Sequence, residues 1–319
     1  SGGQSIYALD ITNVTSSGDF GTSNVMWEYN VTDPTGASST DNSEEMGLIL
    51  SSPQLVRLKS GWAVVFGNGY NSKSQTARLF ILDAATGAEI AVIDTEVGTS
   101  GNPNGLAQPF LLDSDKDRIV DRAYAGDLYG NLWEFDLSDN NTSKWDIPER
   151  TNGNPKLPIP LFTAEDSGGD ARPITTRPVV VAAPEPSTGF IVLFGTGKFI
   201  ETGDNIIPVT PQVQAFYGIH DDGSNLSDAT NLVEQVISEE LDVVDDNGTP
   251  SDTSDDTVLA TTRIVSTNPV DYTATDEGWF IELETPVAAP GTPIAEGERV
   301  ISNPLTRFGR IIFTTFIPA

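Results

Sequence analysis

The chain has 319 residues, with 46 acidic against 17 basic side chains, no cysteine and a formal net charge of −29. So acidic a surface repels nucleic acid and anionic membranes, and it suits divalent cations and basic partners. The absence of cysteine excludes disulfides and thiol chemistry. No stretch reaches the roughly 18 apolar residues that a membrane-spanning helix needs. The first residues, SGGQSIYALD, lack the features of a signal peptide and are typical of a segment from within a longer protein.

Short apolar runs broken by Gly, Pro, Asn and Asp dominate the chain, which is typical of β-strands. One recurring unit is a proline-led strand followed by an apolar strand, found at 51–70, 107–130, 176–199 and 302–318. A second unit has two apolar or aromatic residues, two further residues and an acid, found at 6–10, 79–83, 132–136 and 280–284, with a looser copy at 216–220. Helical periodicity is confined to one candidate, 228–241.

A first unit followed by a second unit amounts to about four strands, and its repetition is typical of β-propeller blades. We therefore expect an all-β, modified β-propeller with about 5–7 irregular four-stranded blades, in a single domain over 1–319. The C-terminal copy stops after its first unit, whereas the N-terminus starts with the second unit. This offset predicts that the N- and C-terminal strands close one blade together, which removes open sheet edges.

The most informative stretch for function begins at Asp113, where carboxylates recur at Asp115, Asp117 and Asp121. These are positions 1, 3, 5 and 9 of an EF-hand-style calcium loop, and Ile119 at position 7 would contribute its backbone carbonyl. The flanking residues are rich in strand formers rather than helix formers, so we expect the loop to bridge two strands. The spacing predicts a Ca²⁺ site whose ligands are Asp113, Asp115, Asp117, Ile119 and Asp121.

Two positions depart from the EF-hand pattern. Arg118 stands at position 6 in place of glycine, and Tyr124 stands at position 12 in place of a bidentate glutamate. Water or other parts of the fold must then supply the remaining ligands. The alternative is a solvated acidic turn in which the aspartates cap local backbone N–H groups.

None of the other motifs in the sequence indicates a catalytic site. His220 is the one histidine, which leaves too few ligands for a catalytic zinc site, and no G-x-S-x-G nucleophile elbow accompanies it. Paired carboxylates of a secreted carbohydrate-active hydrolase or lyase remain the alternative function, since acids abound. A second acidic run, 242–256, matches no known ligand spacing and is better interpreted as a mobile loop.

Three phrases in combination resemble the β-propeller domain of the PilY family, the type IV pilus tip-associated biogenesis factors and adhesins. They are WAVVFGNGYNS at 62–72, DSDKDRIVDRAYAGDLYGNLWEFDLS at 113–138 and VLFGTGKFIETGD at 192–204. The resemblance implies a non-enzymatic, calcium-binding module that supports pilus biogenesis, retraction control and adhesion. It also implies export through the periplasm to the cell surface, at the pilus tip or outer membrane. Its implied partners are minor pilins and a host or abiotic surface.

Overall fold

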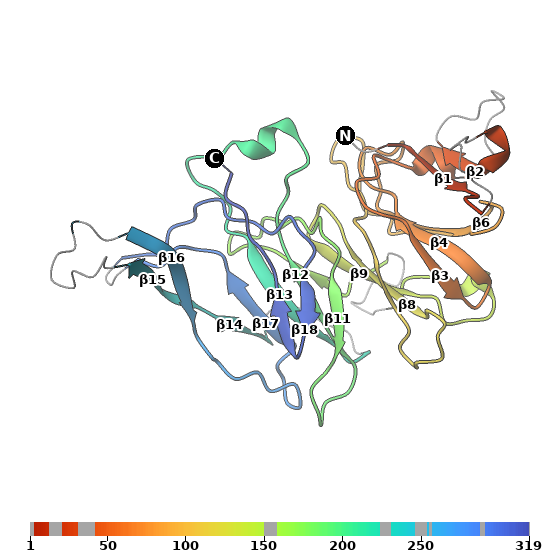
Figure 1. The fold of residues 1–319 in the computed structure, drawn as a ribbon. Helices are drawn as coiled ribbons and strands as arrows, with labels where there is room; N and C mark the ends of the chain where they lie inside the picture. The colour runs from red at the N-terminus through yellow and green to blue at the C-terminus, as the bar shows by residue number, and fades with distance from the viewer. Residues whose placement is uncertain are drawn as a thin grey trace.

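The computed structural model describes residues 3–12, 21–30, 42–149, 158–223, 231–245, 254, 257–287 and 291–318. Over these ranges the chain forms β-strands joined by loops and short 3-10 turns, and no described residue lies in an α-helix (Figure 1). The all-β prediction is confirmed. No helix among the described residues is long and apolar enough to cross a membrane.

Within the described part of the chain, three sheets have four or more strands and three hairpins accompany them. The first sheet has the order β3 (Gln54–Leu58), β4 (Gly61–Gly67), β5 (Arg78–Asp83), β6 (Glu89–Asp94). The second has the order β7 (Phe110–Leu112), β8 (Arg122–Gly126), β9 (Asn131–Asp136), β10 (Phe162–Thr163). The third has the order β11 (Val179–Ala182), β12 (Phe190–Gly195), β13 (Ala215–Asp221), β17 (Gly278–Glu282), β14 (Leu232–Gln235). The hairpins are β1 (Ser5–Leu9) with β2 (Val25–Asn30), β15 (Ile237–Asp245) with β16 (Thr257–Val265), and β18 (Leu305–Arg307) with β19 (Arg310–Ile312).

The sequence repeats correspond to strands. The four proline-led segments become β3, β7, β11 and β18, and each strand begins at the residue after its proline. Proline lacks an N–H group, so the start of a strand is one of the few places where a sheet accepts it. The second repeat unit supplies β1, β5, β9 and β17, and its looser copy supplies β13.

Successive sheets pack face to face in chain order. Trp27 and Tyr29 of the N-terminal hairpin contact Phe80 on one face of the β3–β6 sheet. The opposite face, carrying Val65, packs against Trp133 of the β7–β10 sheet. The β7–β10 sheet in turn packs on β11–β13, which meets the C-terminal segment at its far face. Figure 1 follows this order from the red N-terminal strands to the blue β18.

Glycine ends the second strand of each large sheet because the chain leading to the next sheet crosses there. A Cβ at Gly67 would fall well inside van der Waals contact with the carbonyl of Ala107, and one at Gly195 would overlap Val300. We expect Gly67→Ala to lower the free energy of unfolding by about 2 kcal/mol, as overpacking does. Gly101→Ala, where nothing lies within 4 Å, is the matched control. Equal urea midpoints for the two variants would contradict this account of the crossing.

Three expectations differ from the structure. The terminal strands share no blade: among the described residues β1 pairs with β2 and β18 with β19, and each hairpin packs on its neighbouring sheet. Sheets with four or more strands number three within those residues, below the expected count of blades. The helical candidate 228–241 is wrong for 232–241, which lies in β14 and β15 apart from Val236, and its residues 228–230 lie outside the described residues. There, pairing of β14 with β17 and of β15 with β16 outweighs a helix-like apolar spacing.

Candidate metal centre

The predicted calcium loop joins two adjacent antiparallel strands, β7 and β8, as expected. Leu112 at the end of β7 pairs with Arg122 at the start of β8, and the Asp121 N–H donates to the Leu112 carbonyl at 3.0 Å. The Val120 N–H donates to the Arg57 carbonyl of β3 at 2.9 Å. The loop is therefore closed at its base and attached to the preceding sheet.

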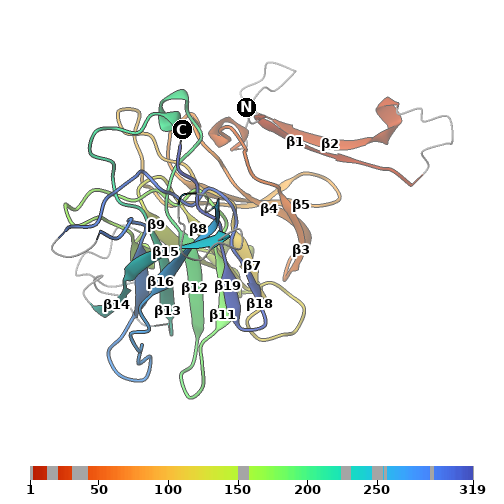
Figure 2. The ribbon, with the colours of Figure 1, turned by 60° about the vertical axis from the view of Figure 1, so that its left-hand side comes forward.

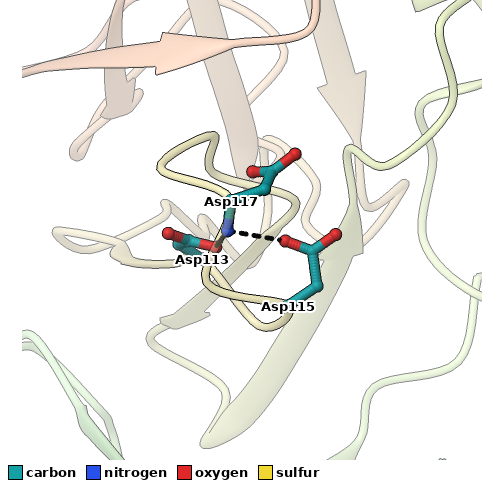
Figure 3. Close-up of side chains that lie close together, drawn as sticks. All are labelled: Asp113, Asp115 and Asp117. Carbon is teal, nitrogen blue, oxygen red and sulfur yellow. Dashed lines mark hydrogen bonds between the residues drawn. The ribbon is translucent and has the colours of Figure 1, made fainter.

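Asp113, Asp115 and Asp117 gather on this loop. One carboxylate oxygen from each lies within 4.8 Å of the other two (Figure 3). The Asp117 N–H donates to both Asp113 and Asp115 at 3.0 Å, which draws their side chains to one side of the turn. A carboxylate has about four lone-pair sites. Oxygen lone pairs therefore remain for a cation after these hydrogen bonds are made.

The backbone makes the turn without glycine. Arg118 has φ of 72° and Lys116 has φ of 67°, both in the left-handed region that glycine prefers. The Arg118 N–H donates to Asp113 at 2.8 Å, which helps to hold this conformation. Arg118 thus adopts at position 6 the kind of backbone geometry for which an EF-hand uses glycine. Its cost is of order 1 kcal/mol.

The other two predicted ligands lie differently. Asp121 is buried, and its carboxylate accepts from the Ser114 hydroxyl at 2.9 Å and from the Ser114 N–H at 3.1 Å. It lies outside the group formed by the first three aspartates. The Ile119 N–H donates to Asp117 at 2.7 Å. Asp121 and the Ile119 carbonyl therefore remain predictions as metal ligands. Asp121 would have to break its hydrogen bonds with Ser114 in order to bind an ion.

One of the carboxylates already has a cationic neighbour. The Ile119 N–H and the Lys59 ammonium, 3.3 Å from Asp117, hold the pKa of Asp117 below its usual range. Asp117 is therefore ionised at neutral pH and ready to bind a cation. Three carboxylates with exposed or half-exposed oxygens form a hard, anionic donor set, which suits Ca²⁺ more than a soft transition metal.

A buried polar centre, which the sequence pattern did not single out, lies at the turn between β8 and β9. Asp127 follows β8 and is fully buried, and it accepts from Asn104 and Asn131 at 2.9 Å and from Trp133 at 2.8 Å. Burial raises the pKa of Asp127, and these hydrogen bonds oppose the rise. The signal in the sequence was the aspartate between Gly126 and an aromatic strand. Its contacts give it a structural role, holding the turn between β8 and β9.

Among the described residues, the other candidates from the sequence form no second cluster of metal-ligating side chains. His220 is buried in β13, with Nε2 2.8 Å from the Thr188 carbonyl and its ring against Tyr272. It therefore has the packed role expected of a histidine in a strand. In the acidic run 242–256, residues 246–253, 255 and 256 lie outside the described residues.

Comparison with known proteins identifies the family to which this fold and sequence are similar. Residues 1–245 match the family model described as the PilY1 beta-propeller domain. Two curated relatives, both described as type IV pilus biogenesis factors, are a PilY1 homolog of Xylella fastidiosa, 36% identical over 99% of this chain, and PilY1 of Pseudomonas aeruginosa PAO1, 35% identical over 88%. This chain spans 20% and 24% of their respective lengths.

A solved structure agrees with the sequence comparisons. The crystal structure of the Pseudomonas aeruginosa PilY1 C-terminal domain superposes with a TM-score of 0.76 and 30% sequence identity. The match covers 99% of this chain and 62% of that one. The family model, the curated relatives and the solved structure all indicate the same family. This chain belongs to the PilY1 β-propeller domain family of type IV pilus biogenesis factors.

Proposed function

We propose that 1–319 is a single propeller domain and the calcium-binding module of a type IV pilus-associated surface protein. The observation that carries the proposal is the convergence of Asp113, Asp115 and Asp117 on one turn, in a chain of this family. Ca²⁺ takes six to eight oxygen ligands. The three carboxylates would supply the core of that set, with Ile119, Asp121 and water as the completing ligands.

Charge is the basis of the proposed mechanism. Three carboxylates within 4.8 Å of one another repel, and among the described residues the ion pair that offsets this repulsion is the one between Lys59, from the turn between β3 and β4, and Asp117. A divalent ion neutralises the cluster and orders the loop, whose position depends on the contact between Val120 and Arg57. The ordered loop would then present the surface that supports pilus biogenesis, control of retraction and adhesion.

The proposed partners and location follow from family membership. Minor pilins are the proposed protein partners, a host or abiotic surface is the proposed adhesion target, and export through the periplasm to the cell surface is the proposed route. The strong negative charge of the chain favours partners with basic surfaces.

We propose a non-enzymatic role over the alternative of a glycan hydrolase. A hydrolase needs two carboxylates available across a pocket. The pocket of about 240 Å³ beside the loop is lined by four acids, Asp121, Glu134, Asp136 and Glu149. Glu134 pairs with Arg122 at 3.0 Å, and Asp121 accepts from Ser114. Asp121 and Glu134 are thus engaged in holding the protein itself, and Asp136 accepts from the Ser138 N–H at 2.8 Å. Turnover of glycans would contradict the proposal.

Titration of the full chain with Ca²⁺ tests the proposed site. We expect calorimetric heat with a 1:1 stoichiometry, and a rise in the melting temperature that EGTA reverses. Ligand linkage predicts about 2.7 kcal/mol of added stability when free calcium exceeds Kd about 100-fold. Absence of both heat and thermal shift would refute calcium binding. Capture of minor pilins with and without calcium then distinguishes two roles of the ion. A switch changes capture, whereas a purely structural ion raises stability and leaves capture unchanged.

A further inference from the structure

A pocket lies where the first strands of the four repeats begin. A pocket of about 290 Å³ is lined by residues that stand one or two positions before the four strand-leading prolines. Its walls include Ser51, Gln108, Thr176 and Asn303, one from each repeat. Residues separated by more than 250 positions in the chain thus share one cavity.

Hydrogen bonds tie the repeats together around this pocket. The Gln108 amide donates to the Ser52 carbonyl at 3.1 Å, and the Asn303 amide donates to Gln108 at 3.4 Å. Asn303 also accepts from the Arg177 N–H at 2.9 Å. Figure 2 shows β7, β11 and β18 gathered in the same region. The cavity is therefore built by side chains that link all four repeats.

The lining is neutral and rich in hydrogen-bonding groups. No described residue that lines the pocket is charged, although the chain carries a net charge of −29. Thr176 is 4% exposed, and its hydroxyl is buried with no hydrogen-bond partner among the described residues. A buried hydroxyl without a partner costs about 1–3 kcal/mol. Because that oxygen is itself buried, a polar ligand would supply the missing partner only once the Thr176 side chain turns toward the pocket.

Apolar surface completes the pocket. Phe199 lines it with 41% of its surface exposed, and Leu50 and Ile301 are similarly exposed there. The Phe199 ring is held edge-on by Phe316, with ring centroids 4.9 Å apart. An aromatic ring fixed in this way offers a preformed face for stacking.

We propose that this pocket binds one neutral monosaccharide ring. A pyranose combines hydroxyls, which match the hydroxyl and amide groups of the lining, with an apolar ring face that stacks on Phe199. Its lack of charge matches the uncharged walls. The volume lies at the lower end of ligand pockets, which run from about 300 Å³, and suits a single ring. This binding is independent of the calcium loop and requires no catalysis.

Saturation-transfer NMR on the full chain tests the proposal, with glucose, galactose, mannose and N-acetylglucosamine as probes at millimolar concentration. We expect transfer to at least one sugar. Thr176→Val should raise its Kd about fivefold, since it removes one hydrogen bond. Phe199→Ala should abolish transfer. Ile301→Trp, which fills the pocket from a 36% exposed position, should abolish it as well.

Phe308→Ala is the matched control, because Phe308 is 97% exposed in the turn between β18 and β19 and does not line the pocket. It should retain sugar binding, and each variant should melt near the temperature of the parent chain. The proposal is overturned if no sugar shows transfer, or if transfer survives Ile301→Trp. Binding of N-acetyltyrosinamide without binding of any sugar would also overturn it, because the pocket would then be a peptide anchor site.

Discussion

Asp115→Asn is expected to weaken calcium binding at least about 100-fold, because ligand charge sets the affinity of oxygen-ligated calcium sites. Asp115 is exposed, and the Asp117 N–H at 3.0 Å is its one hydrogen-bond donor among the described residues. The substitution therefore removes charge from the cluster with little effect on the fold without metal. Calorimetric titration measures the affinity, and the melting temperature in EGTA should stay near that of the parent chain.

Asp121→Asn distinguishes two predictions of calcium affinity, one from the spacing of the loop residues and one from the observed position of Asp121. The spacing alone predicts a loss like that at Asp115, whereas the structure places Asp121 against Ser114. We expect Asp121→Asn to weaken calcium binding only about tenfold, consistent with an outer position that is often filled through water. It should also lower the melting temperature in EGTA, since Asp121 is buried. Equal affinity losses for both variants would show that Asp121 turns inward and binds the ion directly.

Asp127→Ala is expected to produce the largest loss of stability, about 4 kcal/mol. The substitution leaves the buried donors of Asn131 and Trp133 without an acceptor, together with the Tyr129 N–H, which donates at 2.8 Å. Each unsatisfied buried group costs about 1–3 kcal/mol. The substitution also removes the desolvation penalty of one buried carboxylate, which offsets part of that loss of stability. The midpoint of urea unfolding, followed by tryptophan fluorescence, measures the effect.

Asp139→Ala is the matched control for this prediction. Asp139 is an exposed aspartate that accepts from the Asn141 N–H at 2.8 Å and pairs with Lys144 at 3.1 Å. Loss of such exposed contacts costs about 1 kcal/mol or less. A midpoint for Asp127→Ala no lower than that of Asp139→Ala would mean that the buried centre is dispensable.

Local pattern was sufficient for much of the fold. Each strand-leading proline marks the residue before a strand, and each apolar pair followed by an acid marks a strand, which is an interior strand in every copy except β1. These signals are local, since a missing N–H or a run of apolar residues acts on its own neighbours. The same holds for Asp113, Asp115 and Asp117, whose alternate positions on one tight turn bring them together.

Partners distant in the sequence account for the failures. The helix-like spacing near 232–241 gives way to strands because β17 and β16 provide pairing edges. The predicted closing blade is not seen among the described residues, where β1 pairs with β2, β18 pairs with β19, and the N-terminal hairpin packs with Trp27 and Tyr29 on the β3–β6 sheet. Neither outcome depends on the residues of the segment alone.

By itself, then, the chain determined its β-repeats, its strongly acidic charge with a single histidine, and the spacing of the carboxylates of Asp113, Asp115 and Asp117, because each is set by composition or by residues close in sequence. Tertiary structure alone decided that the buried Asp127 accepts from Asn104, which lies 23 positions earlier in the chain. It alone assembled the pocket around Asn303 and Gln108, which are 195 positions apart. Contacts of that range depend on how whole sheets stack, and no local pattern encodes them.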